Sequence, residues 1–168
     1  STIEEIAAEK AGILRPGAPG FFGDQPLPAA IRDAAARLGT PLHCAGRDFG
    51  HVASRPTWSW RGRRAAIGGL AYPPGGTEAQ LRNISLVLAA VEQWRPQLLA
   101  DTGRLNRIIG EARPPGRFQV MEGRHQWVLD VAHNPQAVAT LRAQLATLPA
   151  APHTTAVIGL LGDKSLEA

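Results

Sequence analysis

Apolar positions along the chain alternate between the spacing of a helix and that of a strand. In the opening stretch Ile3, Ile6 and Ala7 share one helical face, and Ser1 or Thr2 can cap this helix. Up to residue 112, the pattern predicts this helix, a strand over 18–23, a helix over 28–38, strands over 41–45 and 48–52, a hairpin over 56–71, and helices over 77–94 and 97–110.

Two of these predicted elements have the clearest spacing. Trp58 and Trp60 alternate with polar residues before Gly62, as in the first strand of a hairpin. In the long helix, apolar residues recur every three or four positions and so share one face, which we expect to be buried. That face consists of Leu81, Ile84, Leu88 and Val91.

A proline run separates the last third of the chain from the rest. Because the two prolines of Arg113-Pro114-Pro115-Gly116 prevent a helix or strand from continuing, we expect a domain boundary there, between 1–113 and 114–168. Apolar strands that alternate with a helix predict a largely parallel, covered sheet, and hence an α/β fold. The predicted elements are strands over 117–122 and 126–131, a helix from Pro135 to about Leu148, and a strand over 154–159.

The composition is typical of a soluble globular protein. The chain has 168 residues, 44% apolar and 19% charged, enough for one domain or for parts of two. Its longest apolar run, 84–91, is far shorter than the ~20 residues of a membrane span. Glu4, Glu5 and Glu9 stand where a secretory leader would be basic or apolar. A single cysteine, Cys44, excludes an internal disulfide and a Cys-rich zinc site, so we expect a cytoplasmic protein.

The charge balance is modestly basic. The net charge is +4, and Arg61, Arg63 and Arg64 form the only tight cationic cluster. Nucleic-acid binding would require a longer basic stripe interleaved with aromatic residues, so we expect no nucleic-acid partner. A pocket for phosphates or carboxylates fits the same balance equally well. The alternative function is a non-catalytic basic module that uses this cluster to bind RNA or another anionic ligand.

Lysine is scarce, since only Lys10 and Lys164 occur among the 18 cationic side chains. Arginine keeps its proton at any accessible pH, whereas a desolvated lysine can lose its proton and act as a nucleophile. Either lysine therefore marks a position that arginine cannot fill, or it lies by chance on a solvated face. The sequence leaves both interpretations open.

The sharpest motif, Asp130-Val131-Ala132-His133-Asn134-Pro135, follows a predicted strand. Ligand sites in parallel α/β sheets lie at the carboxyl ends of strands. There Asp130 can accept hydrogen bonds from ribose hydroxyls, and His133 can contact a phosphate or carboxylate. Alternatively, Asp130 caps the following helix and His133 is an ordinary surface residue; the pattern favours neither.

Two further candidates are weaker when taken alone. Arg117 follows Pro115-Gly116 at the predicted hinge, where a planar guanidinium can clamp phosphate when two domains close. An arginine in a linker needs no such role. Asn83 lies inside the long helix, where an asparagine usually faces water.

Four motifs in register resemble the bifunctional dihydrofolate synthase/folylpolyglutamate synthase family of the Mur ligase superfamily. They are Glu9-Lys10-Ala11-Gly12-Ile13, Asn83, Pro115-Gly116-Arg117-Phe118 and the Asp130–Pro135 motif, and Ile158–Lys164 is similar to the family's next strand and loop. The resemblance implies the tail of a P-loop-type central ATPase domain over 1–113. It also implies the first part of a Rossmann-like Mur ligase C-terminal domain over 114–168.

The resemblance further implies an ATP-dependent ligation. ATP phosphorylates a carboxylate of dihydropteroate or a folate polyglutamate, and the amine of L-glutamate then attacks the acyl phosphate. By the same resemblance, Lys10 is carbamylated and its new carboxylate helps to bind Mg²⁺. Asn83 lies near the adenine, Arg117 at the ATP phosphates, Asp130 at ATP, and His133 near the ATP and glutamate sites.

The chain also departs from the family pattern. Ala79-Gln80 stands where the family usually has His-Gln. No Gly-x-x-x-x-Gly-Lys-Ser/Thr loop occurs, so a backbone cradle for the phosphates is lacking. The family's Mg²⁺-binding glutamate and histidine would lie upstream of Ser1. We therefore expect an internal segment of the enzyme that lacks the N-terminal part and is inactive alone.

Overall fold

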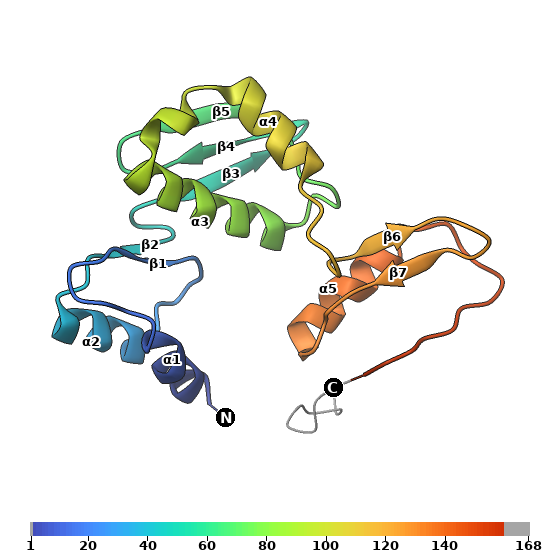
Figure 1. The fold of residues 1–168 in the computed structure, drawn as a ribbon, viewed down its shortest axis with the longest axis horizontal. Helices are drawn as coiled ribbons and strands as arrows, with labels where there is room; N and C mark the ends of the chain where they lie inside the picture. The colour runs from blue at the N-terminus through green and yellow to red at the C-terminus, as the bar shows by residue number, and fades with distance from the viewer. Residues whose placement is uncertain (1, 160–168) are drawn as a thin grey trace. The chain divides into compact units, whose positions relative to one another are not determined.

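The computed structural model describes residues 2–159 (Figure 1). The chain divides into two compact units, an N-terminal unit of residues 1–112 and a C-terminal unit of residues 113–168. Among the described residues, no helix combines the length and the apolar character that crossing a membrane requires.

The N-terminal unit begins with two helices packed on two parallel strands. The Thr2 side chain accepts from the Glu5 amide and the Glu5 carboxylate accepts from the Thr2 amide. Thr2 thus caps the first helix, as predicted, and does so in a capping box with Glu5. The second helix ends at Gly39, whose φ of 62° is the left-handed conformation that glycine favours. These elements are α1 (Ile3–Ala11), β1 (Gly20–Phe22), α2 (Ala29–Leu38) and β2 (Leu42–Cys44).

The rest of the unit is a three-stranded antiparallel sheet against which helices pack. Trp58 and Trp60 lie two residues apart in the central strand and are each 1% exposed. Leu81 and Leu88 of the long helix join them in one core, so the hairpin and the buried helix face are confirmed. The elements are β3 (Gly50–Ser54), β4 (Thr57–Arg61), β5 (Ala66–Leu70), α3 (Glu78–Trp94), η1 (Pro96–Leu99) and α4 (Thr102–Glu111).

The predicted continuous helix over 97–110 is wrong. A 3-10 turn begins at Pro96, and a separate helix begins after Asp101, whose carboxylate accepts from the Arg104 amide at 2.9 Å. Proline in the first turn and aspartate at the N-cap each start a new helical segment, so one apolar pattern covers two elements.

The C-terminal unit contains β6 (Gln119–Met121), β7 (Trp127–Leu129) and α5 (Pro135–Leu145). β6 and β7 pair antiparallel, so the predicted largely parallel sheet is wrong for the described residues. Only residues 122–126 connect the two strands, and a parallel pair needs a crossover of a dozen or more residues.

The strand predicted over 154–159 is also absent from this described segment. Val157 and Ile158 are 91% and 76% exposed, and no neighbouring strand covers them there. A strand with both faces in solvent and no paired edge gains neither apolar burial nor a hydrogen-bonded ladder. Most of the predicted 158–164 motif, Lys164 included, lies outside the described residues.

Candidate functional site

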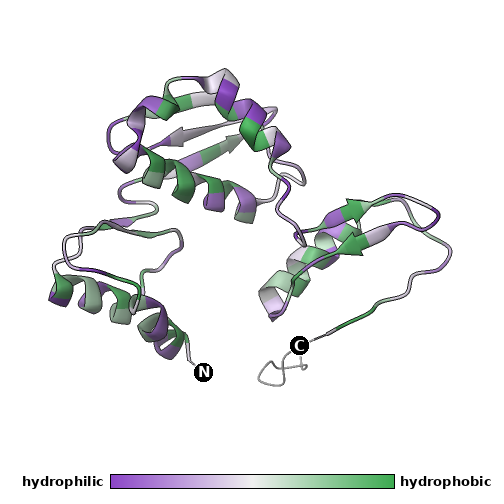
Figure 2. Ribbon diagram, in the orientation of Figure 1, coloured by the Kyte–Doolittle hydropathy of each residue, from purple (hydrophilic) through white to green (hydrophobic). Residues whose placement is uncertain are grey.

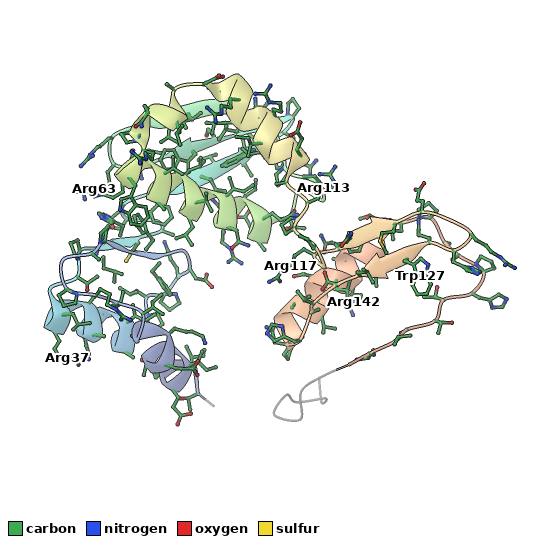
Figure 3. The ribbon with its side chains drawn as sticks, viewed as in Figure 1. Arg37, Arg63, Arg113, Arg117, Trp127 and Arg142 are labelled. Atoms are coloured by element: carbon green, nitrogen blue, oxygen red, sulfur yellow. The ribbon has the colours of Figure 1, made fainter. Side chains whose placement is uncertain are left out.

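A tight turn at residues 114–117 opens the candidate site of the C-terminal unit. The Arg117 amide donates to the Pro114 carbonyl at 3.2 Å, and Gly116 has φ 69°, as the third residue of a type II turn requires. A Cβ at position 116 would lie 3.1 Å from Val131 Cγ1, so this turn approaches the segment after β7 closely. The Arg117 side chain is exposed at the start of the unit (Figure 3).

Asp130 lies just after β7 and accepts two backbone hydrogen bonds. Its Oδ2 accepts from the Phe118 amide at 2.8 Å, and its Oδ1 accepts from the Ala132 amide at 2.7 Å. It does not cap α5, because Asn134 is the N-cap and its Oδ1 accepts from the Ala137 amide at 2.9 Å. The interpretation of Asp130 as the helix cap is therefore wrong.

His133 follows in the same loop and is exposed. Its Nδ1 lies 2.9 Å from the Val131 carbonyl oxygen. Because a carbonyl only accepts, this hydrogen bond requires a proton on Nδ1 and leaves Nε2 of the neutral ring as an acceptor. The ring is thus anchored at one nitrogen, while the other is available to a ligand.

The two other predicted site residues belong to the N-terminal unit and lie on different helices. Lys10 is in the last turn of α1, is exposed, and its Nζ donates to Glu9 Oε1 at 2.6 Å. Asn83 is exposed on α3. The structure thus brings Arg117, Asp130 and His133 together in the C-terminal unit. Lys10 and Asn83 lie in the N-terminal unit, on the separate helices α1 and α3.

Lys10 also borders an apolar groove of about 290 Å³ beside α1. Apart from Lys10 the lining is apolar, so the groove offers no carboxylate to a metal ion. It consists of Ile3, Ile6, Ala7, Ala11, Ile13, Leu14, Phe21, Phe22, Pro28, Ile31 and Leu42.

The described residues do not form a Mg²⁺ site. Mg²⁺ takes oxygen ligands in near-octahedral geometry, and beside Lys10 the structure places one carboxylate, that of Glu9. Between residues 2 and 159 no group of three or more His, Cys, Asp or Glu side chains is arranged to hold a metal ion. A carbamate on Lys10 would add oxygen donors but would not complete such a set.

The N-terminal unit also contains a buried carboxylate that the sequence patterns did not predict. Glu92 of α3 is 6% exposed and accepts from the amides of Arg63, Arg64 and Ala65 at 2.8–3.0 Å. The signal that could have revealed it is an acidic residue four positions after Leu88, on the apolar face of the long helix. These bonds fix the turn between β4 and β5, which carries Arg63 and Arg64 of the arginine cluster.

A small polar pocket of about 10 Å³, lined among others by His43 and Asp48, lies beside this turn. Burial and then the charge of Arg63 lower the pKa of His43. Burial raises the pKa of Asp48, but hydrogen bonds from Arg47 and the Cys44 amide outweigh it, so that pKa stays below its usual value. The volume holds about one water, so this pocket has no room for a larger ligand.

Comparison with known proteins finds similarity along almost the whole chain. The family model of the Mur ligase glutamate ligase domain matches residues 116–168. The dihydrofolate synthase/folylpolyglutamate synthase of Escherichia coli (strain K12) is 30% identical over 97% of this chain, and that of Haemophilus influenzae is 28% identical over 97%. The chain spans 37% and 40% of the length of these two relatives.

Solved structures give the same result. A bifunctional folylpolyglutamate synthase/dihydrofolate synthase with Mn, AMPPNP and L-glutamate bound superposes with a TM-score of 0.70, at 31% identity over 87% of this chain and 34% of its own. The Yersinia pestis CO92 protein gives a TM-score of 0.70 at 33% identity, and the match covers 88% of this chain and 34% of the Yersinia chain. The E. coli protein in complex with DHPP and ADP gives a TM-score of 0.70 at 26% identity, and the match covers 90% of this chain and 35% of the E. coli chain.

Proposed function

Because the chain belongs to the dihydrofolate synthase/folylpolyglutamate synthase family of Mur ligases, we propose that it forms part of an ATP-dependent ligase. This ligase joins L-glutamate to dihydropteroate or to a folate polyglutamate through an acyl phosphate. The observation that carries the proposal is the similarity over 97% of the chain, across both units, to enzymes of this name. The solved relative with AMPPNP, Mn and L-glutamate supports ATP, a divalent cation and glutamate as ligands.

In this proposal, residues 1–113 are the C-terminal part of the central ATP-binding domain, and residues 114–168 are the first part of the Rossmann-like C-terminal domain. The glutamate ligase domain match from residue 116 supports the second assignment. The protein works in the cytoplasm, where ATP and folates are available to it.

Arg117, Asp130 and His133 form the nucleotide-binding part of the C-terminal unit. The exposed guanidinium of Arg117 can form two parallel hydrogen bonds to phosphate oxygens. The anchored ring of His133 presents Nε2 toward ATP or glutamate. Asn83 contributes from α3, near the adenine.

Lys10 is the carbamylated residue of the proposal. Only an uncharged amine adds carbon dioxide, which requires lysine rather than arginine at this position. The Mg²⁺ donors other than this carbamate would come from outside residues 2–159.

The role of Arg117 is tested by kinetics of the full-length protein that carries this sequence. With Mg-ATP, dihydropteroate and L-glutamate, Arg117→Ala should lower kcat/KM by about 10²–10³, because a charged donor to the transferring phosphate is lost. The matched control is Arg142→Ala, an exposed arginine of α5 in the same unit (Figure 3), which should retain activity. Equal activities of the two variants would contradict the role of Arg117, and absence of glutamate-dependent ADP formation in the wild type would contradict the function.

Carbamylation of Lys10 has a readout that does not depend on turnover. In ¹³C-bicarbonate buffer the wild-type protein should show a carbamate carbon resonance that Lys10→Arg lacks. Lys164 stays in this variant as the internal control. A resonance that persists in Lys10→Arg would assign the carbamate to another amine.

A further inference from the structure

Both polar atoms of the Gln80 side chain have partners at the start of α3. Its Oε1 accepts from the Thr77 amide at 2.9 Å and from the Thr77 hydroxyl at 3.1 Å. Its Nε2 donates to the Pro74 carbonyl at 2.7 Å. The Thr77 hydroxyl also accepts from the Gln80 amide at 3.2 Å, so Thr77 and Gln80 form a capping box. The bond to Pro74 reaches beyond this box, into the segment that precedes the helix.

That segment, residues 73–77, contains two adjacent glycines. Gly75 and Gly76 have φ 82° and 51°, in the left-handed region that glycine populates about as readily as the ordinary one. The Gly76 amide donates to the Pro73 carbonyl at 2.9 Å and closes a local turn. The bond from Gln80 Nε2 attaches this turn to α3, whose buried face belongs to the core of the unit. Gln80 therefore gives an otherwise adaptable segment a fixed position relative to α3.

Asn83 lies three positions after Gln80, on the same face of α3, and is exposed. In an α-helix each Cα–Cβ bond tilts toward the N-terminus, so the Asn83 side chain starts toward the turn that holds Gln80 and, beyond it, toward residues 73–77. One helical turn rises about 5.4 Å, which is comparable to the length of a purine ring system. A purine that bonds to Asn83 therefore extends to this segment.

We propose that Gln80 is a positioning residue for the adenine subsite: it holds residues 73–77 as a fixed wall beside Asn83, and this wall makes the subsite selective for adenine. The proposal rests on the proposed function, since it takes Asn83 as the residue near the adenine. Because both polar atoms of the Gln80 side chain already have protein partners, Gln80 acts through the segment and not on the base. A wall of fixed shape distinguishes bases that differ in their exocyclic groups, whereas an adaptable segment accommodates either.

Base selectivity tests this role in the full-length protein that carries this sequence. Gln80→Glu keeps an acceptor for the Thr77 amide but cannot donate to the Pro74 carbonyl. A carboxylate in the first turn also suits the helix dipole, so we expect this variant to fold. The ratio of kcat/KM for Mg-ATP to kcat/KM for Mg-GTP should fall about tenfold, the effect of about one hydrogen bond, with the KM for L-glutamate unchanged.

The matched control is Gln93→Glu, the same change at an exposed position of α3, which should keep the wild-type ratio. Gln80→Ala removes both side-chain bonds and should show the same fall as Gln80→Glu, so it is measured if Gln80→Glu fails to fold. A wild type that uses Mg-ATP and Mg-GTP equally would overturn the proposal. A Gln80→Glu protein that loses activity equally with both nucleotides would also overturn it, because the segment would then not select the base.

The attachment of the segment is measured by amide hydrogen exchange in the full-length protein without ligand. The Gly76 amide should exchange about tenfold faster in Gln80→Glu, because the turn that it closes opens more often once the bond to α3 is lost. The Thr77 amide keeps its acceptor in this variant and should exchange at the wild-type rate. Equal exchange at Gly76 in the two proteins would mean that Gln80 does not hold the segment, and would overturn the proposal.

Asn83→Ala separates this proposal from the proposed function. If Asn83→Ala leaves both the KM for Mg-ATP and the ratio of the two nucleotides unchanged, Asn83 is not the adenine contact. The adenine assignment of the proposed function and the positioning role of Gln80 then fail together. If Asn83→Ala lowers the ratio but Gln80→Glu does not, the adenine assignment stands and only the positioning proposal fails.

Discussion

The two units of this chain are ordered in different ways. In the N-terminal unit, large apolar side chains are buried together, with Trp58 and Trp60 each 1% exposed and Leu70 fully buried. In the C-terminal unit, no side chain described between residues 113 and 159 is buried, and Trp127 is 58% exposed. Hydrophobic residues of β6, β7 and α5 therefore face solvent within that unit (Figure 2).

This difference shows that local order does not require a local core. Burying one large apolar side chain contributes about 1.5–3 kcal/mol, whereas a typical hydrogen bond contributes about 0.5–1.5 kcal/mol net. The C-terminal unit is shaped by side chains of Asp130, Gln119 and Asn134 that accept from backbone amides. Such bonds fix the conformation of turns but add little global stability, so we expect the N-terminal unit to unfold last.

The largest test of this comparison uses the same substitution in both units. Trp60→Ala should lower the free energy of unfolding of the N-terminal unit by about 3–5 kcal/mol, because it leaves a cavity in the core and removes the hydrogen bond from Trp60 Nε1 to the Ser85 carbonyl. Trp127→Ala should change stability by less than about 1 kcal/mol, since this ring is already exposed. Urea titrations followed by circular dichroism measure both, and equal losses would refute the contrast.

A smaller effect is expected at the buried carboxylate of the N-terminal unit. Glu92→Gln replaces an acceptor oxygen by an amide donor that faces the backbone N–H groups of residues 63–65, at a cost of about 1–3 kcal/mol. The matched control is Glu111→Gln at the exposed end of α4, which should stay within about 0.5 kcal/mol of the wild type. Urea titrations of both variants measure these changes in the free energy of unfolding. If Glu92→Gln leaves the free energy of unfolding unchanged, the turn does not depend on the charge of Glu92.

The smallest expected effect is a pH dependence confined to the N-terminal unit. Burial and Arg63 lower the pKa of His43 in the folded protein, so protonation favours the unfolded chain. The free energy of unfolding is therefore unaffected by the protonation of His43 above its ordinary pKa of 6.5. It decreases as the pH falls below 6.5 toward the lower pKa of the folded state. Unfolding free energies from about pH 8 to about pH 5 should therefore decline less in His43→Gln than in the wild type. Parallel profiles would contradict the shift.

Much of the N-terminal unit follows from local signals in the sequence. The Thr2 capping box, the left-handed Gly39 and the alternating tryptophans of β4 each specify an element through contacts within a few residues. The misplaced start of α4 has the same origin, because the apolar spacing continues across Asp101 while the capping chemistry changes there. The role of Glu92 was not predicted because the three amides that donate to it lie 27–29 positions away in the sequence, and no local pattern reveals such a contact.

At the candidate site, the order of residues along the chain establishes which residue types are present and in which turns they lie. An arginine follows Pro-Gly, and an aspartate and a histidine precede a helix that begins at Asn-Pro. These follow from backbone preferences of single residues, which act locally. What Asp130 does follows from the fold, because the antiparallel register of β6 and β7 places the Phe118 amide where it donates to the Asp130 carboxylate. Strand register depends on pairing between distant segments, so the same carboxylate can cap a helix, bind a ligand or hold a linker until the pairing is known.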